Sequence, residues 1–355
     1  MIVVNYGSDI VKNVYDTLKA SDIASYLKTG YSVALKPNLV TARPARDGAT
    51  THTEVLEGII IFLRDFGIRD IRIIESSQVG ESTGRSYRNC GYEDLSARFN
   101  APLVDLKSDR TTRLKFKDMD LEVYNEALNT DFLINVPVLK GHSQTRLTCC
   151  MKNLKGCIPD SEKRRYHTLG IEKPVAALNG VLKTGYCVVD GMCGDLSFEE
   201  GGNPVQANRV IAGRDPVMVD SYCARLIGYR PEDIRHVDYG RQWGIGEFFS
   251  GSVPLIELNA ENKPLRETKS RLTTDRYKHM IEEDSACSAC YASLTYALHR
   301  LRGNVKADGK IHIGQGFKGK AGGFGVGVCC AGFARCVPGC PPDAADIVEA
   351  LSNMK

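Results

Sequence analysis

Short runs of apolar and β-branched residues alternate with segments of helical periodicity along roughly the first 240 residues. The runs that predict strands are residues 2–5, 32–38, 71–76, 102–106, 131–140, 186–191 and 209–213. Helical patterns cover residues 50–67, 144–156, 172–185 and 215–228. This alternation predicts an α/β fold, in which a mostly parallel sheet carries helices on both faces. Ligands of such sheets bind at the carboxyl ends of the strands.

The pattern changes in the last third of the chain. Residues 246–285 contain one expected strand, near 250–259, and a charged stretch with a helix near its end. Residues 287–303 then have a helical pattern, two short strands are expected at 311–316 and 324–328, and a last helix follows the prolines at 341–342. The expected organisation is an α/β core domain (1–245), a connector (246–285) and a smaller, cysteine-rich α/β subdomain (286–355).

Composition and charge narrow the classes of function. The chain is 43% hydrophobic and 25% charged, with a formal net charge of +3. Such a balance gives no reason to expect nucleic acid or an anionic membrane as a partner. The longest apolar run, near 55–63, is far shorter than the roughly 20 residues of a spanning helix, and the N-terminus lacks a signal-peptide pattern. We therefore expect a cytoplasmic protein whose thiols stay reduced.

The thirteen cysteines are unevenly distributed. Six of them lie in the last 70 residues, at Cys287, Cys290, Cys329, Cys330, Cys336 and Cys340. A single buried thiol is an ordinary core residue, but this concentration points to metal binding. A structural zinc is one alternative, although the region has one CxxC rather than two. We favour a [4Fe–4S] cluster, because glycines at 325, 327, 332 and 339 let backbone amides approach the sulfurs.

The same region resembles the cluster-binding pattern in the small subunits of nickel–iron hydrogenases and respiratory complex I. Those proteins hold a [4Fe–4S] cluster with a G-x-C turn and a GCPP turn, which correspond here to 327–329 and 339–342. The resemblance covers about 70 residues and implies Cys287, Cys290, Cys329 and Cys340 as ligands. Cys330 and Cys336 are extra thiols that remain alternative ligands.

A second resemblance covers most of residues 30–235. The stretches LKPNLV (35–40), GATTHTEVLEGII (48–60), NVPVLKGHSQTRLTCCMKNLKGCIP (135–159), VVDG (188–191) and IAGRDPVMVDSYCARLIGY (211–229) are similar to domain-of-unknown-function family 362. Some members carry a ferredoxin-like CxxCxxC segment, which this chain lacks. The resemblance implies a fold and a site location but no substrate.

Polar residues gather where the predicted strands end. Those that suit the carboxylate or phosphate of a small ligand are Lys36, Asn38, Thr51, His52, Lys140, Lys152, Asn153 and Lys155. The alternative for Lys152 and Lys155 is a favourable interaction with a helix C-terminus, and His52 could simply cap its helix. His142 is the best candidate for a general acid or base, because its ordinary pKa is near neutral.

Asp190 ends a predicted strand and is the expected catalytic carboxylate, with a tight turn as the alternative. Asp215 reads as a helix N-cap, and Asp195 and Asp220 are further acidic candidates. Cys149, Cys150 and Cys157 lie close to the expected site; we favour a buried spectator role, with metal binding or electron transfer as the alternative. The basic run at 163–167 is either a lid over an anion or a solvated loop, and the glycine-rich stretch at 313–327 lacks the features of a phosphate loop.

These observations favour a cytoplasmic iron–sulfur oxidoreductase acting on a small anionic substrate, with Lys140, His142 and Asp190 as the catalytic group. A redox partner protein is possible, and no nucleic acid or membrane is expected. One alternative is an electron-transfer or accessory protein for a partner oxidoreductase. Another is an acid–base enzyme whose cluster or zinc is purely structural.

Overall fold

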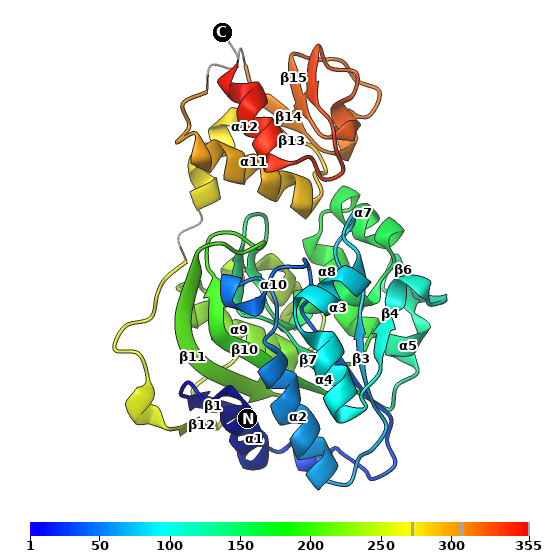
Figure 1. Ribbon diagram of the computed structural model, residues 1–355, viewed down its shortest axis with the longest axis vertical. Coiled ribbons are helices and arrows are strands. Elements are labelled where there is room, and N and C mark those ends of the chain that lie inside the picture. Colours follow the sequence, from blue (N-terminus) through cyan, green and yellow to red (C-terminus); the bar gives the residue numbers. More distant parts are fainter. Residues whose placement is uncertain (271–272, 306–308, 354–355) are drawn as a thin grey trace.

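A computed structural model describes residues 1–270, 273–305 and 309–353. Positions 271–272, in the expected connector, and 306–308 and 354–355, in the expected subdomain, lie outside the described residues. Figure 1 shows two parts of unequal size: a large sheet flanked by helices, and a smaller unit that contains the C-terminal end of the chain.

The large sheet has eight strands in the order β12-β1-β11-β10-β7-β2-β3-β4. Their bounds are β1 Ile2–Tyr6, β2 Val33–Pro37, β3 Ile71–Glu75, β4 Leu103–Asp105, β7 Phe132–Val136, β10 Tyr186–Asp195, β11 Pro204–Gly213 and β12 Leu255–Leu258. All pairings are parallel except those that β11 makes with β1 and β10. The sheet is therefore mostly parallel, as the alternating pattern predicts.

Helices cover both faces of this sheet, because alternate strand residues point to opposite sides. In β2, Val33 and Leu35 belong to one apolar cluster and Ala34 to the other. The first face packs against α1 (Ile10–Ala20), α2 (Thr53–Asp65), α3 (Thr83–Asn89) and α4 (Tyr92–Phe99). The second packs against α6 (Cys150–Asn153), α8 (Glu172–Val181), α9 (Pro216–Leu226) and α10 (Arg235–Gln242). Asp215 caps α9 through its side chain, as expected.

Two small hairpins complete this part of the chain. β5 (Thr111–Phe116) pairs with β6 (Met119–Tyr124), ahead of α5 (Asn125–Leu128). β8 (Lys140–His142) pairs with β9 (Arg146–Thr148). The sequence predicts one helix over 144–156, and this prediction is wrong in its first part. The structure instead has β9, then the short α6, then a 3-10 turn at Leu154–Cys157. The reason is that residues 146–148 pair with β8, and Asp220 accepts hydrogen bonds from the amides of Cys150 and Met151, where α6 begins.

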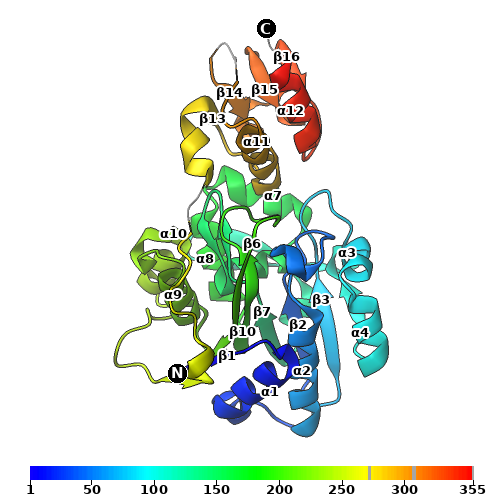
Figure 2. The same ribbon diagram turned by 60° about the vertical axis from the view of Figure 1, so that its left-hand side comes forward.

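The second sheet has four strands, all parallel, in the order β13-β14-β15-β16. They are β13 Ile281–Glu283, β14 Ile311–Ile313, β15 Phe324–Val326 and β16 Arg335–Val337. Helices α11 (Ser288–Arg300) and α12 (Ala344–Ser352) pack on it through their own apolar cluster. The expected connector contributes β12 to the large sheet and β13 to the small one, joined in part by a 3-10 segment at Thr273–Met280. Figure 2 shows α11 on the side of the small unit that faces α7 (Asp160–Thr168).

Among the described residues, the structure contains no helix that is both long and apolar enough to cross a membrane.

Candidate substrate pocket and metal centre

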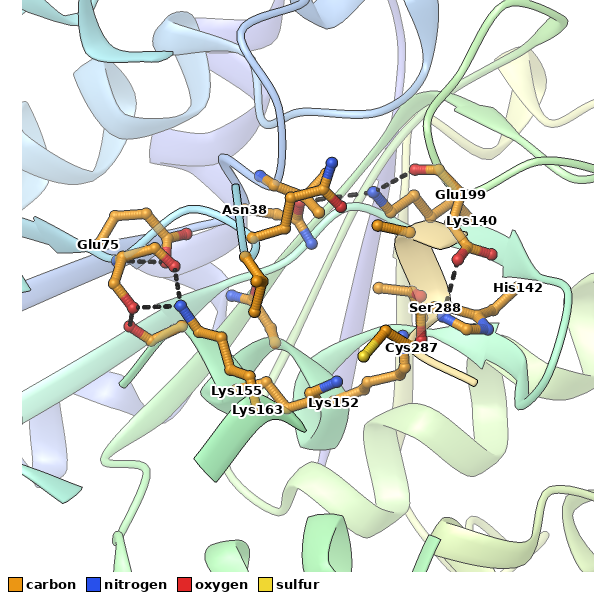
Figure 3. Close-up of a pocket in the computed structure, with 18 of the residues that line it drawn as sticks. Asn38, Glu75, Lys140, His142, Lys152, Lys155, Lys163, Glu199, Cys287 and Ser288 are labelled. Carbon is orange, nitrogen blue, oxygen red and sulfur yellow. Dashed lines mark hydrogen bonds and ion pairs between the residues drawn. The ribbon is translucent and has the colours of Figure 1, made fainter. Parts of the chain in front are cut away.

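Two parallel strands of the large sheet end beside one cavity of about 750 Å³, which we call the lysine pocket. Lys36 and Asn38 reach it from the end of β2, and Glu75 reaches it from the end of β3. Further lining residues come from β8, α6 and α7, and the segment Cys287–Ala289 forms part of the wall (Figure 3). The lysines that line it are Lys36, Lys140, Lys152, Lys155 and Lys163, and the carboxylates are Glu75 and Glu199.

Lys36 is fully buried and already paired. Its Nζ lies 2.6 Å from Glu75 Oε2 and donates to the Pro37 carbonyl. Glu75 also accepts hydrogen bonds from the amides of Leu39 and Ser76. A buried charge pair with these extra donors is satisfied within the protein, so Lys36 shapes the pocket with little capacity left for a ligand.

Lys140 is bound in a similar way, by backbone oxygens. Its ammonium donates to the carbonyls of Ala49 at 2.6 Å and Glu199 at 2.8 Å, and lies 3.4 Å from Asn38 Oδ1. Burial lowers its pKa to about 8, against the opposing effect of the nearby carboxylates. Asn153 is also occupied, since its amide donates to the carbonyls of Lys36 and Pro37 and to Asn135 Oδ1.

Lys152 and Lys155 differ from the other pocket lysines. Within the described part of the chain, neither ammonium makes a hydrogen bond or an ion pair, and both line the cavity. Burial lowers the pKa of Lys152 well below its usual range, and the neighbouring charge of Lys155 adds to this effect. Burial and the charge of Lys163 lower the pKa of Lys155 to about 8. An anion in the pocket would relieve this repulsion.

His142 is buried beside Glu199. Its Nδ1 accepts hydrogen bonds from the amides of Gln144 and Thr145, so the ring proton is assigned to Nε2. Nε2 lies 3.3 Å from Glu199 Oε1, a buried oxygen that accepts no hydrogen bond from the described residues. Burial, with the charges of Lys152 and Lys155, lowers the pKa of His142 well below 6.5. The imidazole is therefore neutral.

The structure places Thr51, His52 and Asp190 outside this pocket. Thr51 donates to the Val136 carbonyl, and Asp190 accepts hydrogen bonds from the His52 amide and ring. His52 Nε2 in turn lies 3.9 Å from Cys193 Sγ.

The sequence did not single out Glu75 and Glu199, and it indicated Lys163 and His167 only as part of a basic run that is either a lid over an anion or a solvated loop. Glu75 had a usable signal, because it ends a strand just as Lys36 does. Lys163 and His167 lie in the basic run at 163–167, which forms part of α7. Lys163 donates to the carbonyls of Ser76 and Ser77 and pairs with Asp160 at 3.1 Å. Nothing in the sequence near Glu199 points to its position.

The four cysteines expected as ligands line a second cavity of about 570 Å³, which we call the cysteine pocket. Cys287, Cys329 and Cys340 each follow a strand of the small parallel sheet, and Cys290 lies in the first turn of α11. Since parallel strands end at the same edge, this topology brings the thiols together. Burial raises the pKa of the Cys287, Cys290 and Cys329 thiols, and repulsion between neighbouring thiolates raises it further. A bound cationic centre would supply the missing compensation.

Cys330 and Cys336 do not line the cysteine pocket. Cys330 is buried against Phe317 and Phe333, and its Sγ lies 3.4 Å from the His312 carbonyl. Cys336 Sγ lies 3.5 Å from the Gly327 carbonyl.

The large domain contains another group of donors that could hold a metal ion. Ligand atoms of Cys149, Cys150 and Asp220 lie within 4.8 Å of one another, and all three residues are buried. Both Asp220 oxygens accept backbone hydrogen bonds at the start of α6, which gives this carboxylate a structural role as well.

Comparison with known proteins identifies the family. The profile of the domain of unknown function DUF362 matches residues 33–225, which is more than half of the chain. The chain belongs to this family. DUF362 has no assigned function in its description, so membership fixes the sequence class and not the reaction. The matched range includes every pocket lysine and ends before the cysteines at 287–340.

Two individual proteins are each similar to part of this DUF362 member. The thylakoid-associated protein sll1697 of Synechocystis is 32% identical over 146 residues, which is 41% of this chain and 44% of that protein. The lactate racemase apoprotein from Thermoanaerobacterium thermosaccharolyticum has a TM-score of 0.43 at 12% identity, covering 63% of this chain and 57% of the other.

Proposed function

We propose that this protein is an iron–sulfur oxidoreductase that binds a small anionic substrate in the lysine pocket. A [4Fe–4S] cluster would be held by Cys287, Cys290, Cys329 and Cys340. The observation that carries the proposal is the position of Cys287, which lies in the wall of both pockets. A ligand of the cluster would therefore adjoin the substrate.

The spacing of the thiols supports a cluster over a single zinc ion. A tetrahedral zinc with Zn–S bonds of about 2.3 Å needs sulfurs about 3.8 Å apart. Among the described residues, however, the compact donor group is Cys149, Cys150 and Asp220, and no three thiols of the cysteine pocket lie within 4.8 Å of one another. The four sulfurs line a cavity of about 570 Å³, an arrangement that favours a centre larger than a single ion.

The cluster would supply one-electron transfer, with electrons exchanged with an external one-electron carrier protein. The exposed position of Cys340 supports access for such a partner. In the lysine pocket, Lys152 and Lys155 would bind the anion, Glu199 Oε1 would hold or release a proton, and the neutral His142 would orient Glu199. Lys36, Lys140 and Asp190 would contribute indirectly, by holding neighbouring groups in position.

The proposal is tested by measuring iron and acid-labile sulfide on protein purified without oxygen. We expect about four of each per chain, and a large loss of both in the Cys340→Ser variant. Cys336→Ser is the matched control, because Cys336 lies in β16, just before Cys340 in the chain, but outside the pocket, and it should keep its iron. Zinc without sulfide, or undiminished iron in Cys340→Ser, would rule out this cluster.

A further inference from the structure

The charge balance of the lysine pocket is incomplete. Three of its five lysines have their partners inside the protein: Lys36 with Glu75, Lys163 with Asp160, and Lys140 with backbone carbonyls close to Glu199. Lys152 and Lys155 have no such partner among the described residues. Neither ammonium therefore contacts a counter-charge, although the Glu199 carboxylate lines the same cavity.

These two lysines converge on one place. They are three residues apart in the α6 segment and the turn that follows it, a spacing that puts side chains on the same side. Lys152 is only 9% exposed, yet it lines the cavity. A buried ammonium without a partner is unfavourable, so the arrangement is stable only if a ligand supplies the negative charge or a proton is lost.

The N-terminus of α11 faces the same space. Cys287, Ser288 and Ala289 line the lysine pocket, and α11 is a helix of thirteen residues. The first amides of a helix have no partner within it and carry partial positive charge. The Ser288 amide has a contact of 3.4 Å with His167 Nε2, while the Ala289 amide has no partner among the hydrogen bonds of the described residues.

We infer that the lysine pocket is built for a phosphate group, carried by the substrate or free in solution. The group would lie between Lys152, Lys155 and the N-terminus of α11. Two ammonium groups and a helix end present more positive charge and more donors than one carboxylate can use, whereas a phosphate has two negative charges and at least three acceptor oxygens. This inference rests on the proposed anion-binding role of the pocket and adds the chemical class of the anion.

The experiment is a calorimetric titration of the anaerobically purified protein with inorganic phosphate, a small phosphomonoester and acetate, at constant ionic strength. We expect both phosphates to bind at least tenfold more tightly than acetate. The phosphomonoester should bind more tightly than phosphate if the group belongs to the substrate, and less tightly if free phosphate is the ligand. Equal binding of acetate would overturn the inference.

Substitutions assign the site. Lys155→Met and Lys152→Met should each weaken phosphate binding at least tenfold, while the double Lys152→Arg/Lys155→Arg variant should retain most of it. The exposed Lys173 of α8 provides the control, and Lys173→Met should bind normally. Circular dichroism and iron content identify variants that fail to fold, and unchanged phosphate affinity in folded Lys155→Met and Lys152→Met would place the anion elsewhere.

The outcome is separable from that of the cluster proposal. Phosphate binding to a wild-type protein that proves to lack iron would uphold the phosphate site and defeat the cluster. A normal iron content with no preference for phosphate over acetate would defeat the phosphate site alone.

Discussion

Asp190 holds two segments of the chain with one carboxylate. Its Oδ2 accepts from the His52 amide and lies 2.8 Å from His52 Nδ1, while Oδ1 accepts from the Met192 amide. Burial alone would lower the pKa of His52, but the charge and hydrogen bond of Asp190 outweigh it and raise the pKa to about 10. The imidazolium is therefore a structural cation at neutral pH.

This pair predicts a pH-dependent contribution to stability. Because the folded pKa of His52 lies above the unfolded value of about 6.5, its contribution is complete below pH 6.5 and is lost as the pH rises toward 10. We expect the difference in free energy of unfolding between wild type and His52→Gln to shrink by roughly 2–4 kcal/mol over that range. Urea denaturation at several pH values measures it, with the exposed His279→Gln as control. A difference that stays constant with pH would contradict the ion pair.

For single residues, the sequence predicted where a side chain lies better than it predicted which groups that side chain contacts. Lys36 and Lys140 were expected near a site because they end predicted strands, and both line the lysine pocket. Their internal acceptors could not be foreseen, since Glu75 lies 39 residues after Lys36 in the chain and the Glu199 carbonyl 59 residues after Lys140. Conversely, Lys152 and Lys155 had an ordinary helix-end explanation, and they do lie in the last turns of α6 and of the 3-10 turn that follows, but the sequence did not show that both also line the lysine pocket.

The hairpin β8–β9 is held against the loop that carries Glu199 by a close backbone approach. A Cβ at Gly141 would lie 2.6 Å from the carbonyl carbon of Leu196 and 3.1 Å from its Cα. Gly194 makes the reciprocal approach, since its Cβ would lie 3.1 Å from the carbonyl carbon of Leu139. Both contacts are with backbone atoms, so neighbouring side chains cannot relieve them by rotating.

We therefore predict that Gly141→Ala lowers the free energy of unfolding by about 1–3 kcal/mol and also weakens anion binding, because Glu199 and Lys140 are displaced together. Denaturant unfolding and the phosphate titration measure the two effects. Gly251→Ala is the matched control, since a Cβ there has no neighbour within 4 Å. Wild-type stability in Gly141→Ala would show that the two backbones can separate easily.

Elements with an unambiguous pattern were predictable from the sequence, but length alone did not decide the outcome. The five-residue strands β2, β3 and β7 and the long α2 were anticipated. The three-residue strands β14 and β15 were anticipated too, whereas the equally short β13 and β16 and the eleven-residue α1 were not, and β5–β6 has a mixed polar face. The helical reading of 144–156 failed because pairing with β8 outweighs the local pattern.

At the scale of the whole molecule, a few polar contacts and one aromatic group join the small unit to the large one. Gln144 donates to Glu283 and to the Ala286 carbonyl, and Gln315 donates to the Arg164 carbonyl. The Phe198 ring packs edge-on to Tyr296. The division of the chain into a core domain, a connector and a subdomain, with boundaries at 245 and 286, stays a prediction. The contacts described above join residues of the core domain to residues beyond it.

Removal of the proposed cluster should therefore have a local effect. Without a centre to hold the thiols, the amides between 311 and 340 should exchange much faster, because the strands of the small sheet have only three residues each. The large sheet should be unaffected. Hydrogen exchange before and after treatment with a chelator and oxidant tests this, with Cys340→Ser as the variant that should not respond. Unchanged exchange at 311–340 would mean that the thiols bind nothing structural.

The two sheets present the same kind of edge to each other. The lysine pocket follows β2 and β3, and the cysteine pocket follows β13, β15 and β16, so most of their lining residues come from different parts of the chain. Evolution can therefore alter the turns of one sheet to change what the lysine pocket binds, and the turns of the other to change the proposed metal centre. The segment Cys287–Ala289 is the exception. All three of its residues line the lysine pocket, and Cys287 also lines the cysteine pocket, so a mutation in this segment would affect both sites.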